Sequence, residues 1–189
     1  TSVLSKLRCP MKVLISNLYE CAVNDIIIYK TSPQKVIFIA TQDKNTKSAI
    51  SHLQKKFQNI NFEVIYVDEF DIVGITKKID AAIKKEKGNQ ISVNVTEGRK
   101  IMSLAGVFAG GLNKEYIEGV FYLRQDNHEL MQVPLPNFRL SGNKLKILSE
   151  LDNGINKVND IQKRVKVHRS LIYAILIELE KEGYINSEK

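Results

Sequence analysis

Residues 91–109 read ISVNVTEGRKIMSLAGVFA, and this stretch joins a short apolar run to a longer amphipathic one. Ile91–Val95 is typical of a buried strand, and about Arg99–Ala109 is typical of a helix. The same alternation recurs upstream. It predicts strands over Met11–Ser16, Lys35–Ala40 and Phe62–Val67, and helices over about Tyr19–Tyr29, Asn45–Phe57 and Ile72–Lys85. This order predicts an α/β fold built on a doubly wound, mostly parallel sheet with helices on both faces.

Downstream of this pattern the sequence predicts an edge hairpin and then a small helical module. Gly119–Arg124 and Glu129–Val133 are expected to pair as antiparallel strands at the edge of the sheet. The prolines of Val133–Asn137 (VPLPN) keep the next segment extended, which is typical of a boundary. Helices are then predicted over Gly142–Leu151, Val158–Val165 and Arg169–Glu182, as in a winged helix-turn-helix. We therefore expect domains over residues 11–133 and 139–189, a linker over 134–138, and an N-terminal extension of open role over 1–10.

The composition of the 189 residues is ordinary for a globular protein, with 43% hydrophobic and 26% charged residues. The 2 cysteines and 3 histidines form neither a disulfide framework nor a metal-ligand spacing, so we expect a cytoplasmic protein without a metal or other cofactor. No apolar run reaches the roughly 20 residues of a membrane span, and no signal peptide is evident. The net charge of +7 favours a phosphate-bearing partner.

The first candidate site segment follows the first predicted strand, because open parallel sheets bind ligands beyond the carboxyl ends of their strands. Ser16, Asn17 and Leu18 are expected to begin this loop. No GxGxxG motif follows the strand and no GxxxxGK[ST] occurs in the chain, so dinucleotide and P-loop sites lack their motifs. The histidines are too scattered for a Ser-His-Asp set.

The second candidate segment, Asn94–Lys100, follows the fourth predicted strand. Asn94 and Thr96 can offer side-chain oxygens, and Gly98 would let a ligand approach the backbone. Arg99 and Lys100 fall in the first turn of the next helix. The helix dipole disfavours cations there, so the pair is expected to face an anion. Glu97 is a single carboxylate without an evident partner and is more typical of a helix cap than of a catalyst.

The sequence resembles the CARF-domain proteins of archaeal CRISPR systems in three features. These are the segment Asn94-x-Thr96-x-Gly98-Arg99, the apolar helix start Ile101–Gly106 and the C-terminal winged-helix pattern. The resemblance implies a Rossmann-like domain and a homodimer whose two-fold axis runs through a pocket for a cyclic oligoadenylate. Cyclic tetra-adenylate suits that symmetry, because each subunit would contact half of the ring. The expected ligand-binding residues are Ser16, Asn17, Leu18, Asn94, Thr96, Glu97, Gly98, Arg99 and Lys100.

Two branches of this family share the architecture: ring nucleases that cleave the messenger, and transcription regulators that bind DNA. We favour the nuclease branch, because the last predicted helix is largely apolar and only Asn186–Lys189 follow Ile185, too few for a wing, which predicts weak DNA binding at most. Cleavage would proceed without a metal, by attack of a ribose 2′-hydroxyl. The expected catalytic residues are Ser16, Arg99, Lys100 and Lys166, the last chosen from Lys163, Arg164 and Lys166. A sensor that only binds the messenger is the third alternative.

Overall fold

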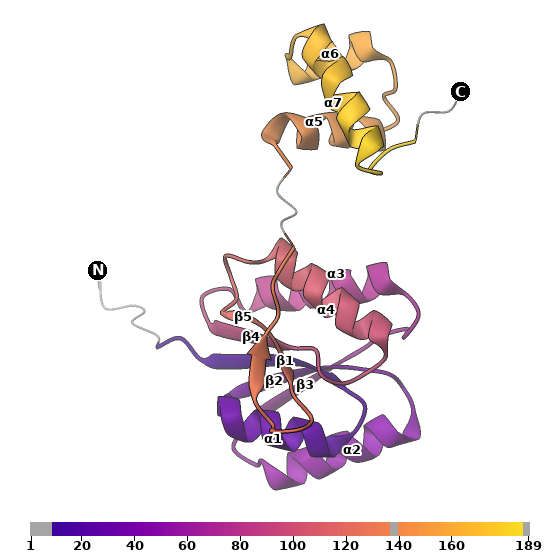
Figure 1. The fold of residues 1–189 in the computed structure, drawn as a ribbon. Helices are drawn as coiled ribbons and strands as arrows, with labels where there is room; N and C mark the ends of the chain where they lie inside the picture. The colour runs from indigo at the N-terminus through magenta and orange to yellow at the C-terminus, as the bar shows by residue number, and fades with distance from the viewer. Residues whose placement is uncertain (1–8, 137–139, 187–189) are drawn as a thin grey trace, which may run out of the picture. The chain divides into compact units, whose positions relative to one another are not determined.

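The computed structural model describes residues 9–136 and 140–186, and the chain divides into two units, residues 1–137 and 138–189 (Figure 1). The first unit alternates strands and helices as predicted. Its elements are β1 (Lys12–Leu18), α1 (Cys21–Thr31), β2 (Lys35–Ala40), α2 (Lys44–Lys56), β3 (Asn61–Tyr66), α3 (Ile72–Lys85), β4 (Gln90–Asn94), α4 (Lys100–Leu112), β5 (Gly119–Leu123) and β6 (Leu130–Gln132).

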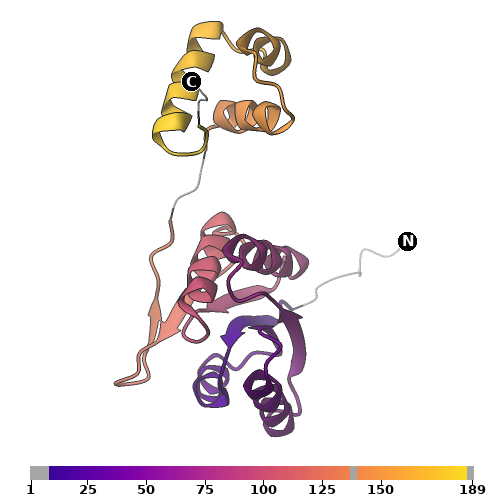
Figure 2. The same cartoon turned by 90° about the vertical axis from the view of Figure 1, so that its right-hand side faces the viewer.

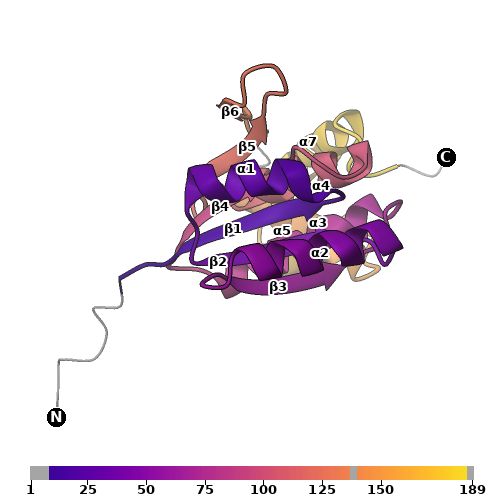
Figure 3. The ribbon, with the colours of Figure 1, turned by 90° about the horizontal axis from the view of Figure 1, so that it is seen from below.

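The six strands form one sheet in the order β3-β2-β1-β4-β5-β6. Every neighbouring pair is parallel except β5 and β6, which pair antiparallel at the edge. The predicted mostly parallel sheet with an edge hairpin is therefore confirmed. The strand order reverses direction between β1 and β4, so the chain leaves these adjacent strands toward opposite faces. Helices α1 and α2 cover one face, and α3 and α4 cover the other (Figures 1 and 3).

Each face of the sheet has its own apolar core. Strand β2 (KVIFIA) is buried throughout and contributes alternate side chains to both cores, as central parallel strands do. Ile37 and Ile39 pack toward α3 and α4, whereas Val36 and Phe38 pack toward α1 and α2. The rigid sheet fixes where the loops at its carboxyl edge begin. None of the helices in the described ranges has the length and apolarity that crossing a bilayer requires.

Strand β1 corrects the sequence-based placement of Ser16, Asn17 and Leu18 in a loop. All three residues continue the strand to Leu18 and are buried. Ser16 pairs across the ladder with Phe38 of β2 and Asn94 of β4. The two polar residues suggested a loop, but the Ser16 hydroxyl is hydrogen-bonded to Asn24 and Asn94, and Asn17 is buried. Residues 1–8 of the expected N-terminal extension lie outside the described residues, and Cys9 and Pro10 are exposed.

The second unit consists of three helices, α5 (Gly142–Asp152), α6 (Val158–Val165) and α7 (Arg169–Lys181). Ile147, Ile161 and Ile172 are at the centre of its small core. Between residues 140 and 186 the structure has no strand. The winged-helix assignment therefore stays a prediction. Although α7 is largely apolar, it leaves Leu171 and Ile177 exposed on the surface of this unit.

Candidate functional site

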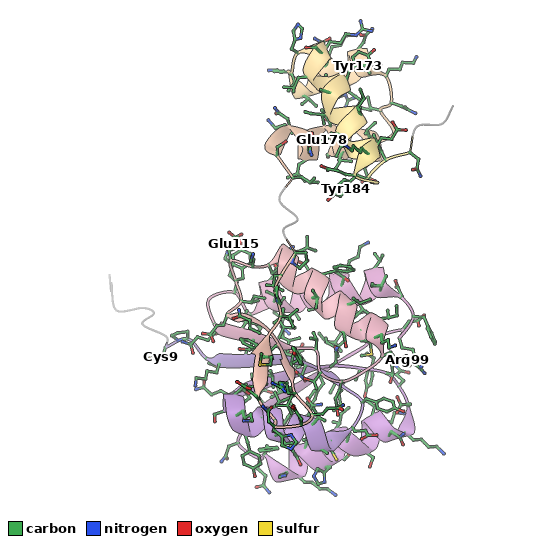
Figure 4. All side chains as sticks on the ribbon, in the orientation of Figure 1. Cys9, Arg99, Glu115, Tyr173, Glu178 and Tyr184 are labelled. Carbon is green, nitrogen blue, oxygen red and sulfur yellow. The ribbon has the colours of Figure 1, made fainter. Side chains whose placement is uncertain are left out.

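The candidate site lies at the carboxyl edge of the sheet, where the loops after β1, β2, β3 and β4 gather. Arg99, after β4, and Cys9, before β1, are labelled at opposite edges of the sheet in Figure 4. Figure 2 looks onto the edge that carries Arg99. Because parallel strands end together, side chains far apart in sequence meet here.

A chain of buried polar contacts organises this edge beneath its surface. The Asn94 Nδ2 donates to Ser16 Oγ at 2.8 Å, and Ser16 Oγ donates to Asn24 Oδ1 of α1 at 2.6 Å. The Asn94 Oδ1 accepts from Thr96 Oγ1 at 2.5 Å. Ser16 and Asn94 are 0% and 1% exposed, so they hold α1 and the loop after β4 in place from below. The expectation that the Ser16 hydroxyl faces a ligand is wrong for this structure, since protein groups occupy it.

Glu97 joins the two segments that the sequence singled out. Its Oε2 accepts from the backbone N–H of Glu20 at 3.2 Å and from Asn24 Nδ2 at 2.8 Å, with a longer contact of 3.4 Å to the N–H of Tyr19. Burial raises the pKa of the carboxyl group, although these hydrogen bonds oppose the rise. Glu97 thus caps the start of α1. Its position in the sequence did not reveal that α1 would be its partner.

Gly98 is required by contacts inside the protein. Its φ of +83° lies in the left-handed region, and a Cβ there would come 3.1 Å from Met102 Sδ and 3.4 Å from the Asn17 Cβ. Contacts with β1 and α4 therefore account for this glycine, and the expectation that a ligand approaches its backbone stays a prediction. The Asn17 Nδ2 is buried beside it with no hydrogen-bond partner among the described atoms.

An open hollow of about 600 Å³ lies at this edge, and we call it the Arg99 hollow. The Arg99 Nε lies 2.5 Å from Glu69 Oε2, and the guanidinium group lies over the Phe70 ring, 5.2 Å from its centroid. The Phe70 ring is 71% exposed and Tyr19 is 46% exposed, so two aromatic surfaces face solvent. The lining residues are Tyr19, Thr41, Gln42, Asp43, Lys44, Asn45, Val67, Asp68, Glu69, Phe70 and Arg99.

Most of this lining was missed from the sequence. The segments Thr41–Asn45 and Val67–Phe70 follow β2 and β3, which end at the same edge, whereas the switch in strand order selected only the loops after the first and fourth strands. The available signal was an aromatic residue, Phe70, in the short polar segment after the predicted strand Phe62–Val67. Glu69 was not recognised as the partner of Arg99.

The helices that begin at the Arg99 hollow differ in their caps. Asp43 accepts from the N–H of Thr46 at 2.8 Å and closes the start of α2, and its hydrogen bonds with Thr41 and Thr46 lower its pKa to about 2. Asp71 closes α3 in the same way. Helix α4 instead follows Arg99, which makes no side-chain cap. Its positive end and the Arg99 side chain together make this start suited to an anion.

The predicted segment Asn94–Lys100 is divided between two hollows. Arg99 lines the first, whereas Thr96 lines a second open hollow of about 640 Å³, which we call the hairpin hollow. Lys100 begins α4 and is exposed. Lys166 belongs to the second unit, where it ends α6 with a φ of +56°. The hairpin hollow is lined by Val95, Thr96, Tyr122, Leu123, Arg124, Gln125 and Asp126.

Comparisons with known proteins identify the family of the fold. Residues 13–152 match the family model described as the Card1 CARF domain. A search of curated proteins found no match. Among solved structures, the chain resembles Can2 from Sulfobacillus thermosulfidooxidans in complex with cyclic tetra-adenylate, with a TM-score of 0.51 and 14% identity over 82% of this chain and 57% of that one.

Two further structures show the same fold. Enterococcus italicus Csm6 bound to cyclic hexa-2′-fluoro-hexa-dAMP has a TM-score of 0.57 and 15% identity over 94% of this chain and 57% of that one. A type III CRISPR defence DNA nuclease activated by cyclic oligoadenylate has a TM-score of 0.51 and 13% identity, over 86% of this chain and 32% of that one. The chain thus spans 57% of the length of the first two structures.

Proposed function

The chain belongs to the Card1 CARF domain family, and from this premise we propose that it binds a cyclic oligoadenylate at the carboxyl edge of its sheet. The observation that carries the proposal is Arg99, a cation held over the exposed Phe70 ring at the uncapped start of α4. A nucleotide offers both groups that such a site suits, an anionic phosphate and a flat base. Exposed rings accept bases by stacking, and arginine binds phosphate through charge-assisted hydrogen bonds.

In the proposed complex a phosphate replaces Glu69 as the partner of Arg99, and Lys100 adds a second positive charge. Cyclic tetra-adenylate is the proposed ligand, bound by a homodimer in which each subunit contacts half of the ring. The buried contacts of Ser16, Asn94 and Glu97 keep the loops after β1 and β4 in fixed positions, so little ordering is required on binding.

We further propose that the bound ring is cleaved. The ribose 2′-oxygen would lose its proton and bond to the adjacent phosphorus. The bond to the 5′-oxygen would break, that oxygen would take up a proton, and a 2′,3′-cyclic phosphate would remain. Arg99 and Lys100 would stabilise the charge that develops on the phosphorane. Ser16 is retained only as a positioning residue because its hydroxyl is buried. Lys166 is proposed as the contribution of the second unit.

The experiment is to incubate the full chain with cyclic tetra-adenylate in a chelator-containing buffer and to identify products by mass spectrometry over time. Linear products ending in a 2′,3′-cyclic phosphate, lost in the Arg99→Ala/Lys100→Ala variant, would support cleavage. No histidine lines the Arg99 hollow among the described residues, so slow turnover is expected. Tight binding with an intact ligand would indicate a sensor, and the absence of binding would contradict the proposed function.

A second candidate function is a DNA-binding regulator controlled by the messenger. The observation in its favour is the short turn between α6 and α7, where the exposed cations Arg164, Lys166 and Arg169 are close in sequence. The exposed Leu171 and Ile177 of α7 disfavour base reading, which needs polar side chains. Specific binding to a promoter fragment that falls steeply with salt would favour this function over cleavage.

A further inference from the structure

The loop between β4 and α4 has a hollow on each side, and the function proposed above uses only the Arg99 hollow. The hairpin hollow is bounded by the start of the same loop, Val95 and Thr96, and by the end of β5 and the hairpin turn, Tyr122–Asp126. Figure 2 shows this hairpin extending from the edge of the sheet. Thr96 and Arg99 are three residues apart, so their Cα atoms lie within about 11 Å of each other.

Thr96 fixes the hairpin against this loop. The register of β4 with β5 ends at the pair Asn94 and Phe121, after which the N–H of Val95 donates to the Phe121 carbonyl at 2.9 Å. Beyond that point the Thr96 Oγ1 accepts from the N–H of Leu123 at 2.7 Å and continues the connection. The two walls of the hairpin hollow are therefore held together before any ligand arrives.

Tyr122 gives this hollow an uncovered aromatic surface. On the same strand, Val120 is 0% exposed in one core and Leu123 is 4% exposed in the other, whereas Phe121 is half-buried. The Tyr122 side chain is left 41% exposed. An exposed ring beside a concave surface is a platform on which a nucleobase can stack.

Arg124 lines the same hollow and pairs with Asp126. Its Nε donates to Asp126 Oδ1 at 3.0 Å, and its Nη2 lies 2.5 Å from Asp126 Oδ2. The turn is closed by the N–H of Arg124, which donates to the Glu129 carbonyl at 2.9 Å, and by the N–H of His128, which donates to the Arg124 carbonyl at 3.1 Å. The hairpin hollow thus has the same residue types as the Arg99 hollow, namely an exposed aromatic ring and an arginine paired with a carboxylate.

We propose that the hairpin hollow is a second nucleotide subsite, in which a purine base stacks on Tyr122 and a phosphate binds Arg124. The inference rests on the proposed function and adds to it. The two hollows of one subunit take neighbouring nucleotides of one ring. A dimer then provides four subsites, which matches a ring of four adenylates.

The test is calorimetric titration of the full chain with cyclic tetra-adenylate. Stacking on an aromatic side chain is worth about 1–3 kcal/mol per base, so Tyr122→Ala should weaken affinity by about 5- to 150-fold. Tyr122→Leu, which keeps apolar bulk for folding, should weaken it similarly, whereas Tyr122→Phe should retain wild-type affinity. Tyr184→Ala, which removes a 47% exposed tyrosine from the second unit, is the matched control and should leave affinity unchanged.

The outcomes separate this inference from the proposed function. If the wild type binds and Phe70→Ala weakens binding, but neither Tyr122→Ala nor Tyr122→Leu does so, the second subsite is overturned while the proposed function stands. If the wild type does not bind cyclic tetra-adenylate, the proposed function fails, and the second subsite fails with it. Equal losses in Tyr122→Phe and Tyr122→Leu would also overturn it, since they would assign the effect to the hydroxyl.

Discussion

At the scale of single residues, the ion pair between Arg99 and Glu69 gives the site its sharpest test. A charge-assisted hydrogen bond is worth about 1.5–3 kcal/mol, so Arg99→Ala should weaken cyclic tetra-adenylate binding by about tenfold or more. Calorimetry measures the change. Arg164→Ala is the matched control, because Arg164 is 59% exposed and pairs with Glu150, much as Arg99 is 55% exposed and pairs with Glu69. Unchanged affinity in Arg99→Ala would place the phosphate elsewhere.

Glu97 is a single residue that should make the folding stability of the protein depend on pH. Because burial raises the pKa of its carboxyl group, the folded state favours the protonated form more than the unfolded state does. The stability that Glu97 contributes is thus fully present below the pKa that its carboxyl group has in the unfolded state. It is lost as the pH rises through the higher pKa of the folded state. Glu97→Gln, which stays neutral, should raise the melting temperature at pH 7 and lose this advantage as the pH falls toward 4. Thermal melts across this range measure the difference, and an advantage that grows toward low pH would contradict the assignment.

At the scale of elements, a buried ion cluster joins β2, β3 and the end of α3. The Lys35 Nζ lies 2.7 Å from Glu86 Oε1 and 2.8 Å from Glu63 Oε2. Burial lowers the pKa of Lys35, but its hydrogen bonds to Glu63 and Glu86 outweigh this and raise it. Removing Glu86, the more buried of the two partners, leaves the Lys35 charge with only Glu63, whose side chain is 33% exposed. We therefore expect Glu86→Ala to destabilise the protein by about 3 kcal/mol in urea titrations.

An exposed ion pair on the same helix provides the control. Lys84 pairs with Asp80 at 2.9 Å and one helical turn away, and its side chain is 61% exposed. Such pairs contribute about 0.3–0.5 kcal/mol, so Lys84→Ala should change stability little. Equal losses of stability in Glu86→Ala and Lys84→Ala would mean that the Lys35 cluster contributes no more than an exposed ion pair does.

Elements were more predictable from the sequence than contacts between them. The apolar period located β2, α3 and α6 at the observed bounds, because burial against a sheet or a helix sets that period directly. Strand β1 was cut short at Ser16, since a buried polar residue such as Asn17 looks like a loop residue in a single sequence. The Arg99 hollow was half predicted. Its cation came from a local pattern, whereas Glu69 and Phe70 come from the loop after β3, a strand three positions away from β4 in the sheet.

At the scale of the whole molecule, the two-fold symmetry of the proposed ligand, cyclic tetra-adenylate, calls for a homodimer. A closed dimer presents the same surface twice, once to each half of the ring. Light scattering should report twice the 21.5 kDa of one chain at micromolar concentration. Helix α4 starts at the site and exposes Leu104 (48%) and Leu112 (56%) eight residues apart, on one face. Lysine at both positions should shift the mass toward that of one chain. A monomeric wild type, with or without cyclic tetra-adenylate, would contradict the proposed dimer.

The last prediction concerns the contribution of the second unit to cleavage. If Lys166 stabilises charge that develops only during cleavage, Lys166→Ala should slow the single-turnover rate while leaving the affinity for the ring unchanged, since transition-state interactions alter rate rather than ground-state binding. Lys163→Ala is the control, because Lys163 is also an exposed lysine of this unit but pairs with Asp160. Its rate should match the wild type.

Parallel losses of rate and affinity in Lys166→Ala would instead indicate a general contact with the ring. Unchanged rates in both variants, with cleavage intact, would mean that neither lysine acts in catalysis and that the first unit cleaves the messenger without them.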